Sequence, residues 1–143
     1  MENINKMKLT FSAKSENEGF ARSVVACFIL KLNPTLSQLS DIKTAVSEAV
    51  TNAIVHGYNN KGGQVTIDAE IIDKKVHISV FDDGVGIENI EQALEPFYTT
   101  KKDEERSGMG FTIMKSFMDE VIVESKIGCG TKVYMTKLLR ADA

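Results

Sequence analysis

The stretch that most constrains this chain runs from Leu36 to Gly57, because its apolar residues recur at one spacing. Steps of three and four residues are the period of an amphipathic α-helix. Thr35-Leu36-Ser37-Gln38 has the form of a capping box, and Gly57 is a natural C-terminal stop. The sequence therefore predicts a helix over residues 36–56, with this apolar face: Leu36, Leu39, Ile42, Val46, Ala49, Val50 and Ala53.

Two polar residues lie at the edge of that apolar face. Glu48 and Asn52 are four residues apart, so they stack on one side of the helix about one turn from each other. They fall beside Ala45 and Ala49, at the rim of the apolar stripe. From the helix alone two interpretations stay open. One is an ordinary solvated helix edge, and the other is a carboxylate and a carboxamide that line a pocket.

Composition excludes several classes of protein. The 143 residues are enough for one core and show no internal break, so we expect a single domain over residues 1–143. A net charge of −3 provides no basic surface for nucleic acid or for an anionic membrane. The sequence has no apolar run of the roughly 18 residues that span a membrane, and no signal-peptide pattern at its start. We therefore expect a cytoplasmic protein without direct nucleic-acid or membrane contacts.

The two cysteines and two histidines limit the metal and redox chemistry. Cys27 lies in an apolar run and is expected in the core, whereas Cys129 lies in a Gly-Cys-Gly turn. This set cannot build a disulfide framework or a four-ligand zinc site. Metal binding through His56 and His77 is not expected either.

The remaining elements follow from periodicity. Alternation predicts a strand over residues 7–13, a hairpin over 65–80 and a last hairpin over 121–138. Ser15 to Glu18 matches a capping box that would open a helix reaching residue 32, and a short helix follows Gly110. Five strands and three one-sided helices predict an α+β fold. This fold is a two-layer sandwich whose mixed, mostly antiparallel sheet has helices on one face, with helix 36–56 at the centre.

Two glycine-containing motifs follow the long helix in the chain. Asp82-x-Gly84-x-Gly86 comes directly after a predicted strand. It is either a simple turn or a ligand site, in which the carboxylate accepts a hydrogen bond from an amine such as that of adenine. Gly108-Met109-Gly110 opens a helix. It is either a flexible linker or an anion site, because free N–H groups and the helix dipole favour phosphate there.

The order of the three motifs is more specific than any one of them. Glu-x-x-x-Asn on a helix, Asp-x-Gly-x-Gly after a strand and Gly-x-Gly before a helix resemble the N, G1 and G2 boxes of the GHKL ATPase and kinase superfamily. That superfamily has the two-layer Bergerat sandwich. The segments 47–58, 97–101, 105–114 and 118–125 are similar to the serine kinases that act as anti-sigma factors, especially those of endospore-forming bacteria.

This resemblance implies roles for the residues of the three motifs. Asn52 is expected to bind Mg²⁺, and Glu48 to act as the general base toward a serine hydroxyl. Asp82 would hold the adenine amine of ATP. Gly84 and Gly86 would leave room for the base. The phosphates would be held by the loop before the last helix, at Ser107, Gly108, Met109 and Gly110.

The resemblance also implies an ATP lid over residues 88–107. Arg106 is expected to reach the γ-phosphate, with Thr99, Thr100 and Lys101 as further nucleotide contacts. Thr131 is either an adenine-binding residue or an ordinary β-branched strand residue. The side chain of Met109 is expected in the core.

The partners implied are a sporulation sigma factor, which the protein would inhibit, and an anti-anti-sigma protein, which it would phosphorylate on serine. Two alternatives stay open: an ATP-gated binding module without kinase activity, and the kinase of the general stress sigma switch. The catalytic fragment of a histidine kinase is not expected, because 143 residues leave no room for a phospho-acceptor helix bundle beside this domain. Helix 15–32 has apolar residues on more than one face, including Val24 and Phe28. We therefore expect a homodimer, and Arg22 is a candidate contact with the sigma factor.

Overall fold

The computed structural model describes residues 4–58, 61–87 and 110–139, and the structural statements below concern these residues. Its strands form a single sheet in the order β1-β2-β3-β5-β4, and every pairing in it is antiparallel. The strands are β1 (Ile4–Ser12), β2 (Gln64–Ile72), β3 (Lys75–Asp82), β4 (Glu120–Lys126) and β5 (Gly130–Leu138). The predicted five-stranded α+β sandwich is confirmed.

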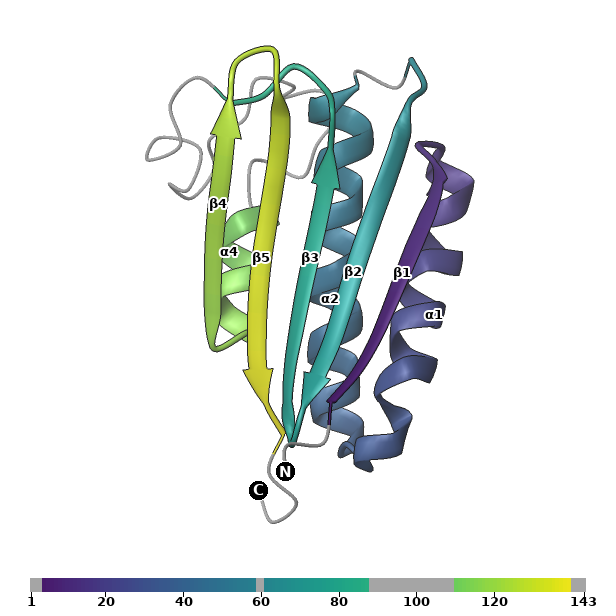
Figure 1. Cartoon of the computed structure of the whole chain (residues 1–143), viewed down its shortest axis with the longest axis vertical. Helices are drawn as coiled ribbons and strands as arrows, with labels where there is room; N and C mark the ends of the chain where they lie inside the picture. The colour runs from purple at the N-terminus through teal and green to yellow at the C-terminus, as the bar shows by residue number, and fades with distance from the viewer. Residues whose placement is uncertain (1–3, 59–60, 88–109, 140–143) are drawn as a thin grey trace.

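The helices lie together on one face of the sheet, with α2 between α1 and α4 (Figure 1). They are α1 (Glu18–Ile29), α2 (Leu36–Asn52), which continues into a π-helical turn (Ala53–Gly57), and α4 (Gly110–Phe117). The central position predicted for helix 36–56 is confirmed. Among the described helices, none is both long and apolar enough to cross a membrane.

The core lies between this helical layer and the sheet. Ile42, Val46 and Val50 on α2 are fully buried, in one cluster with the inward-facing residues of the central strands, such as Ile67 and Ile78. Burying one such side chain stabilises the fold by about 1.5–3 kcal/mol. The alternation of buried residues, strict in β2 and nearly so in β3, fixes which face of each strand meets α2.

The two predicted capping boxes have different outcomes. Thr35 Oγ1 accepts a hydrogen bond from the Gln38 backbone N–H at 3.0 Å, and Gln38 Oε1 accepts one from the Thr35 N–H at 2.9 Å, so this box is confirmed. The predicted box from Ser15 to Glu18 is wrong. Residues 15–17 form a 3-10 turn, and α1 begins at Glu18 without a side-chain cap. The reason is that the Glu18 carboxylate accepts a hydrogen bond from the Ser47 hydroxyl of α2 at 2.7 Å.

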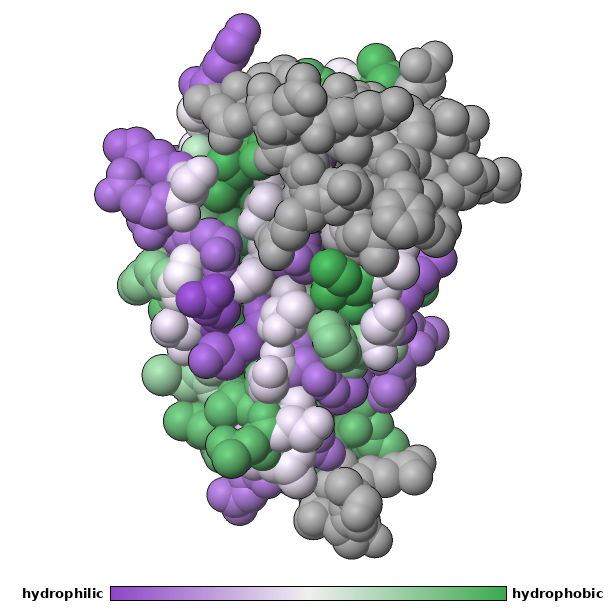
Figure 2. Space-filling view, turned by 180° about the vertical axis from the view of Figure 1, so that it is seen from behind, coloured by the Kyte–Doolittle hydropathy of each residue, from purple (hydrophilic) through white to green (hydrophobic). Residues whose placement is uncertain are grey.

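Helix α1 buries one face and exposes another. Ala21, Val25 and Ile29 are buried, whereas Phe20 is 54% exposed. Cys27 is also exposed, so its predicted place in the core is wrong: it lies on the outward side of the helix. Seen from the helical side, apolar side chains gather at the surface near the end of α1 (Figure 2, lower left).

Candidate functional site

Glu48 and Asn52 on α2 meet the first residue of α4. A Cβ atom built on Gly110 would lie 3.0 Å from Nδ2 of Asn52 and 3.5 Å from Oε2 of Glu48. Glu48 is only 3% exposed, so the solvated-edge interpretation is wrong for this residue. A side chain at position 110 would therefore require the Asn52 amide to move. Residues from two predicted motifs, 58 positions apart in the chain, therefore lie side by side.

The Asn52 carboxamide is the least satisfied polar group at this contact. Its Nδ2 atom is buried and has no hydrogen-bond partner among the described residues. A buried amide without a partner costs about 1–3 kcal/mol, so native proteins keep few of them. A half-turn of the amide would exchange its nitrogen and oxygen with little change of shape. The group can therefore present either a donor or an acceptor toward Gly110.

The π-helical turn after Asn52 carries the chain from this contact to the end of β3. The Tyr58 N–H donates to the Ala53 carbonyl at 3.2 Å, five residues back, which is the π-helical pattern. Gly57, predicted only as a helix stop, then packs directly on Asp82: a Cβ at Gly57 would lie 2.8 Å from Asp82 Oδ1. Turns of this kind are frequent at functional sites. Here the turn joins the second predicted motif to the first.

Asp82 is the last residue of β3, and its side chain is 7% exposed. Burial raises the pKa of its carboxyl above the ordinary value of 3.8. Backbone hydrogen bonds from Gly84 and Thr131 oppose that shift, and the neighbouring charge of Asp83 adds to it. The Gly84 N–H donates to Asp82 Oδ1 at 2.8 Å. Asp82 is therefore a buried acceptor with a fixed orientation.

Gly84 and Gly86 are placed by close backbone packing. A Cβ at Gly84 would lie 2.0 Å from the Gly57 carbonyl oxygen. Gly86 has a φ of +81°, and its Cβ would lie 2.2 Å from the carbonyl oxygen of Lys126. These contacts explain why neither position accepts a side chain. The predicted role of the two glycines beside a ligand stays a prediction.

Thr131 pairs with Asp82 across β3 and β5. Its hydroxyl lies 2.7 Å from the hydroxyl of Ser125 on β4, and Ser125 Oγ also accepts from the Ile87 N–H at 2.7 Å. Ser125 thus ties the segment after Asp82 to the β4–β5 hairpin. The sequence predicts no role for Ser125, because a single serine in an alternating strand gives no signal of its own.

Arg22 belongs to the contact between α1 and α2. Its NH1 atom lies 3.1 Å from Glu18 Oε2 and 3.3 Å from the Ser47 hydroxyl, and its side chain is 41% exposed. The guanidinium therefore has intramolecular partners and an accessible surface. A contact of Arg22 with a partner protein stays a prediction.

The rest of the predicted site lies outside the described residues. This applies to the whole predicted lid over 88–107 and to the start of the predicted phosphate loop. The residues concerned are Thr99, Thr100, Lys101, Arg106, Ser107, Gly108 and Met109. Of that loop, the structure describes Gly110.

Comparison with known proteins agrees with this architecture. The sequence profile of the histidine kinase-like ATPase domain matches residues 11–137. The anti-sigma F factor of Clostridium acetobutylicum is 63% identical over 133 residues, which cover 93% of this chain and 93% of that protein. The anti-sigma F factor of a Thermoanaerobacter species is 57% identical over 142 residues, which cover 99% of each chain.

One solved structure has the same fold at much lower identity. The RsbU and RsbW domains of Rv1364c from Mycobacterium tuberculosis match with a TM-score of 0.67 and 20% identity. The match covers 94% of this chain and 32% of that one. At this identity the likeness supports the fold alone.

Proposed function

The chain belongs to the histidine kinase-like ATPase domain family, and within that family it groups with the proteins named anti-sigma F factor. From this membership we propose that it is an ATP-dependent protein serine kinase that also acts as an anti-sigma factor. The observation that carries the proposal is the convergence of Glu48, Asn52 and Gly110. It brings a candidate base, a candidate metal ligand and the end of a candidate phosphate loop together.

A magnesium nucleotide fits the chemistry of the described residues. Mg²⁺ prefers oxygen ligands. The Nδ2 atom of Asn52 is buried and lacks a partner among the described residues, and a half-turn of the amide would put the Asn52 oxygen in its place. When bound, the ion would neutralise the charge on the phosphates. At the other end of the site, the Asp82 carboxylate would accept a hydrogen bond from the exocyclic amine of adenine.

Glu48 is the residue to which we assign the chemistry. The serine oxygen of the substrate would attack the γ-phosphorus while the bond from that phosphorus to the β–γ bridging oxygen breaks. The hydroxyl proton would pass to the Glu48 carboxylate, and ADP would leave. Position supports this role, because Glu48 is buried beside the end of the proposed phosphate loop. Arg106 is proposed to stabilise the γ-phosphate.

The proposed partners follow from the relatives. Proteins of that name are 57–63% identical to this chain, which favours a sporulation sigma factor as the inhibited partner and an anti-anti-sigma protein as the kinase substrate. The general stress sigma switch is the second candidate, but the RsbW-containing structure is only 20% identical. We also propose a cytoplasmic homodimer. Sedimentation that finds only a species of the monomer mass, 15.8 kDa, at micromolar protein would refute the dimer.

Incubation with γ-labelled ATP, Mg²⁺ and a candidate anti-anti-sigma protein tests the kinase activity directly. We expect label on a serine of that protein and none when Mg²⁺ is removed by chelation. ATP binding without any transfer of label would contradict the kinase proposal and favour the ATP-gated binding module. In that case the sigma-binding half of the proposal would still be measurable by titration.

A further inference from the structure

Tyr58 links three parts of the chain through one hydroxyl group. The hydroxyl donates a hydrogen bond to the carbonyl oxygen of Gln64 at 2.7 Å and accepts one from the Asp83 N–H at 2.7 Å. Gln64 opens β2, Asp83 directly follows β3, and Tyr58 directly follows the π-helical turn. The hydroxyl therefore holds the ends of two adjacent strands to the end of the long helix.

The ring of Tyr58 packs against the backbone at Gly63. Gly63 has a φ of +136°, and a Cβ there would lie 2.6–2.7 Å from three carbon atoms of the Tyr58 ring. Only glycine leaves room for the ring at this distance. Two separate features thus fix the orientation of the Tyr58 side chain: the ring packs on a backbone position that requires glycine, and the hydroxyl makes two hydrogen bonds.

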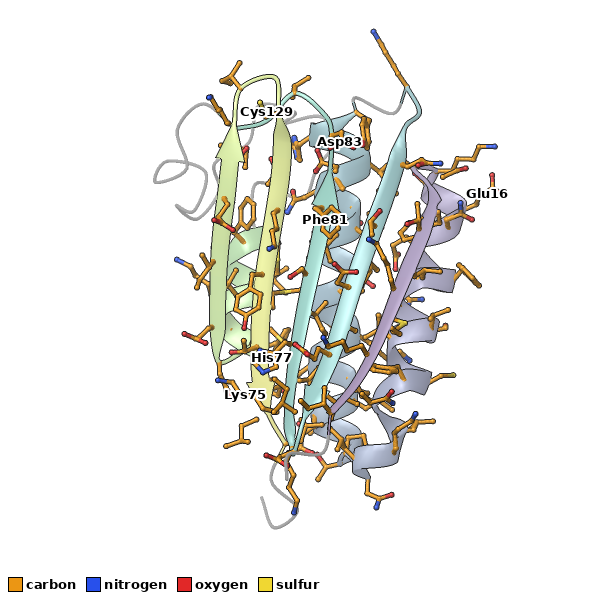
Figure 3. The ribbon with its side chains drawn as sticks, viewed as in Figure 1. Glu16, Lys75, His77, Phe81, Asp83 and Cys129 are labelled. Atoms are coloured by element: carbon orange, nitrogen blue, oxygen red, sulfur yellow. The ribbon has the colours of Figure 1, made fainter. Side chains whose placement is uncertain are left out.

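What Tyr58 holds is the main chain next to Asp82. Asp83 is the residue between Asp82 and Gly84, and the Gly84 N–H donates to the Asp82 carboxylate at 2.8 Å. On the other side, the Gly57 carbonyl accepts from the Val85 N–H at 2.9 Å. The turn that aims the Asp82 carboxylate is therefore held from residues 57 and 58 at both of its ends. Figure 3 shows Asp83 at this end of the sheet.

We propose that Tyr58 is a positioning residue for nucleobase selection: through Asp83 it sets the direction of the Asp82 carboxylate, and so the preference for adenine over guanine. This inference rests on the proposed ATP binding. An acceptor discriminates between the bases by geometry, because adenine has an amine where guanine has a carbonyl oxygen. A carboxylate that turns away loses that discrimination even when the phosphates are still bound.

The test compares Tyr58→Phe with wild type for binding of ATP and GTP by titration calorimetry. Phenylalanine keeps the ring on Gly63 and removes only the hydroxyl. Because the Asp83 N–H bond is at an exposed position, water can replace its partner and the fold should persist. We expect ATP affinity to fall about five- to ten-fold, the scale of one or two hydrogen bonds. GTP affinity should stay near its wild-type value, so the ATP-to-GTP ratio falls, and kcat at saturating ATP should change less than KM.

Tyr134→Phe is the matched control. The Tyr134 hydroxyl lies 2.6 Å from Nδ1 of His77, whose label lies far from Asp83 along the sheet (Figure 3). This variant also removes one hydroxyl from the sheet, but it should leave the ratio unchanged. Circular dichroism first checks that Tyr58→Phe is folded; an unfolded variant would overturn the inference, because Tyr58 would then be required for the fold and not for base selection.

Two negative results have different meanings. If wild type prefers ATP, Asp82→Asn abolishes the preference and folded Tyr58→Phe keeps it fully, the inference about Tyr58 is overturned and the proposed function stands. If wild type binds no ATP, the proposed function fails, and the inference fails with it. An equal loss of preference in Tyr58→Phe and Tyr134→Phe would also overturn the inference, since it would reflect general loosening of the sheet.

Discussion

Gly110 lies so close to Asn52 that a Cβ atom on the glycine would approach the Asn52 amide nitrogen to 3.0 Å. Few Cβ atoms in proteins make so short a contact, so a larger residue requires Asn52 to move. Gly110 begins α4, whereas Asn52 ends α2. The start of α4 thus packs directly on the last side chain of α2, so a change at Gly110 also changes the position of Asn52.

Gly110→Ala tests the contact between Gly110 and Asn52. We expect affinity for ATP with Mg²⁺ to fall by about 10–100-fold, the usual effect of disturbing the surroundings of a metal ligand. Affinity for ADP with the metal chelated should fall much less, because the displaced group is the metal ligand. Gly19→Ala is the matched control: its Cβ would meet only the end of Arg22 at 3.6 Å. Titration calorimetry measures both affinities for wild type and for each variant. Equal losses in Gly110→Ala with and without Mg²⁺ would contradict the assignment of Asn52.

Glu48→Gln tests the proposed base. Glutamine keeps the size and hydrogen-bonding capacity of the buried side chain but cannot take up a proton. We expect ATP binding to persist and serine phosphorylation to fall by about 10² or more, the scale of general-base catalysis. Glu124→Gln, at an exposed position on β4, should leave the rate unchanged. Phosphate transfer at the wild-type rate would make Glu48 a structural residue.

Most of the fold could be predicted from the sequence because its signals are local. The three- and four-residue spacing gave α2, and alternation gave the hairpins, since each reports which side of one element is buried. The prediction for Cys27 is wrong because an apolar run does not say which side of a helix faces outward, and the other failures come from long-range contacts. The carboxylate of Glu18 is bound by Ser47, 29 positions away, so its local capping box does not form. In the same way, no local pattern marks Gly57 as the residue that packs on Asp82.

The nucleotide is expected to decide which partner the protein favours. We predict tighter sigma-factor binding with ATP than with ADP, because a ligand shifts an equilibrium only by its differential affinity for two states. Couplings of this kind are about 1–3 kcal/mol, or roughly 5–150-fold in affinity. Titration of the sigma factor with each nucleotide measures the difference, which should vanish in Arg106→Ala. Equal affinities in wild type would mean that ATP serves the kinase reaction only.

Thr35→Ala tests the energetic role of the capping box that begins α2. The substitution removes the acceptor for the Gln38 N–H, at 3.0 Å in the structure. We expect a loss of about 1 kcal/mol in the free energy of unfolding, the usual effect of losing such a cap. Urea denaturation measures it. Because Thr35 lies at the opposite end of α2 from Asn52, ATP affinity of the folded variant should not change, and a large change would show that the helix transmits the disturbance to the site.

The buried carboxyl of Asp82 should make stability depend on pH in a definite direction. Burial raises its pKa in the folded protein above 3.8, so between 3.8 and the raised value the folded state holds a proton that the unfolded state has released. Stability from this group is therefore present at low pH and is lost as pH rises through that interval.

Asp82→Asn cannot ionise, so its stability relative to wild type should increase with pH over the interval, by at most about 1.4 kcal/mol per pH unit, and then level off. Urea denaturation of both proteins without nucleotide, from pH 4 to 7, measures this difference and cancels the titration of the other carboxyl groups. A difference that shrinks as pH rises would mean that the carboxylate form of Asp82 is stabilised by its hydrogen bonds from Gly84 and Thr131 more than it is disfavoured by burial.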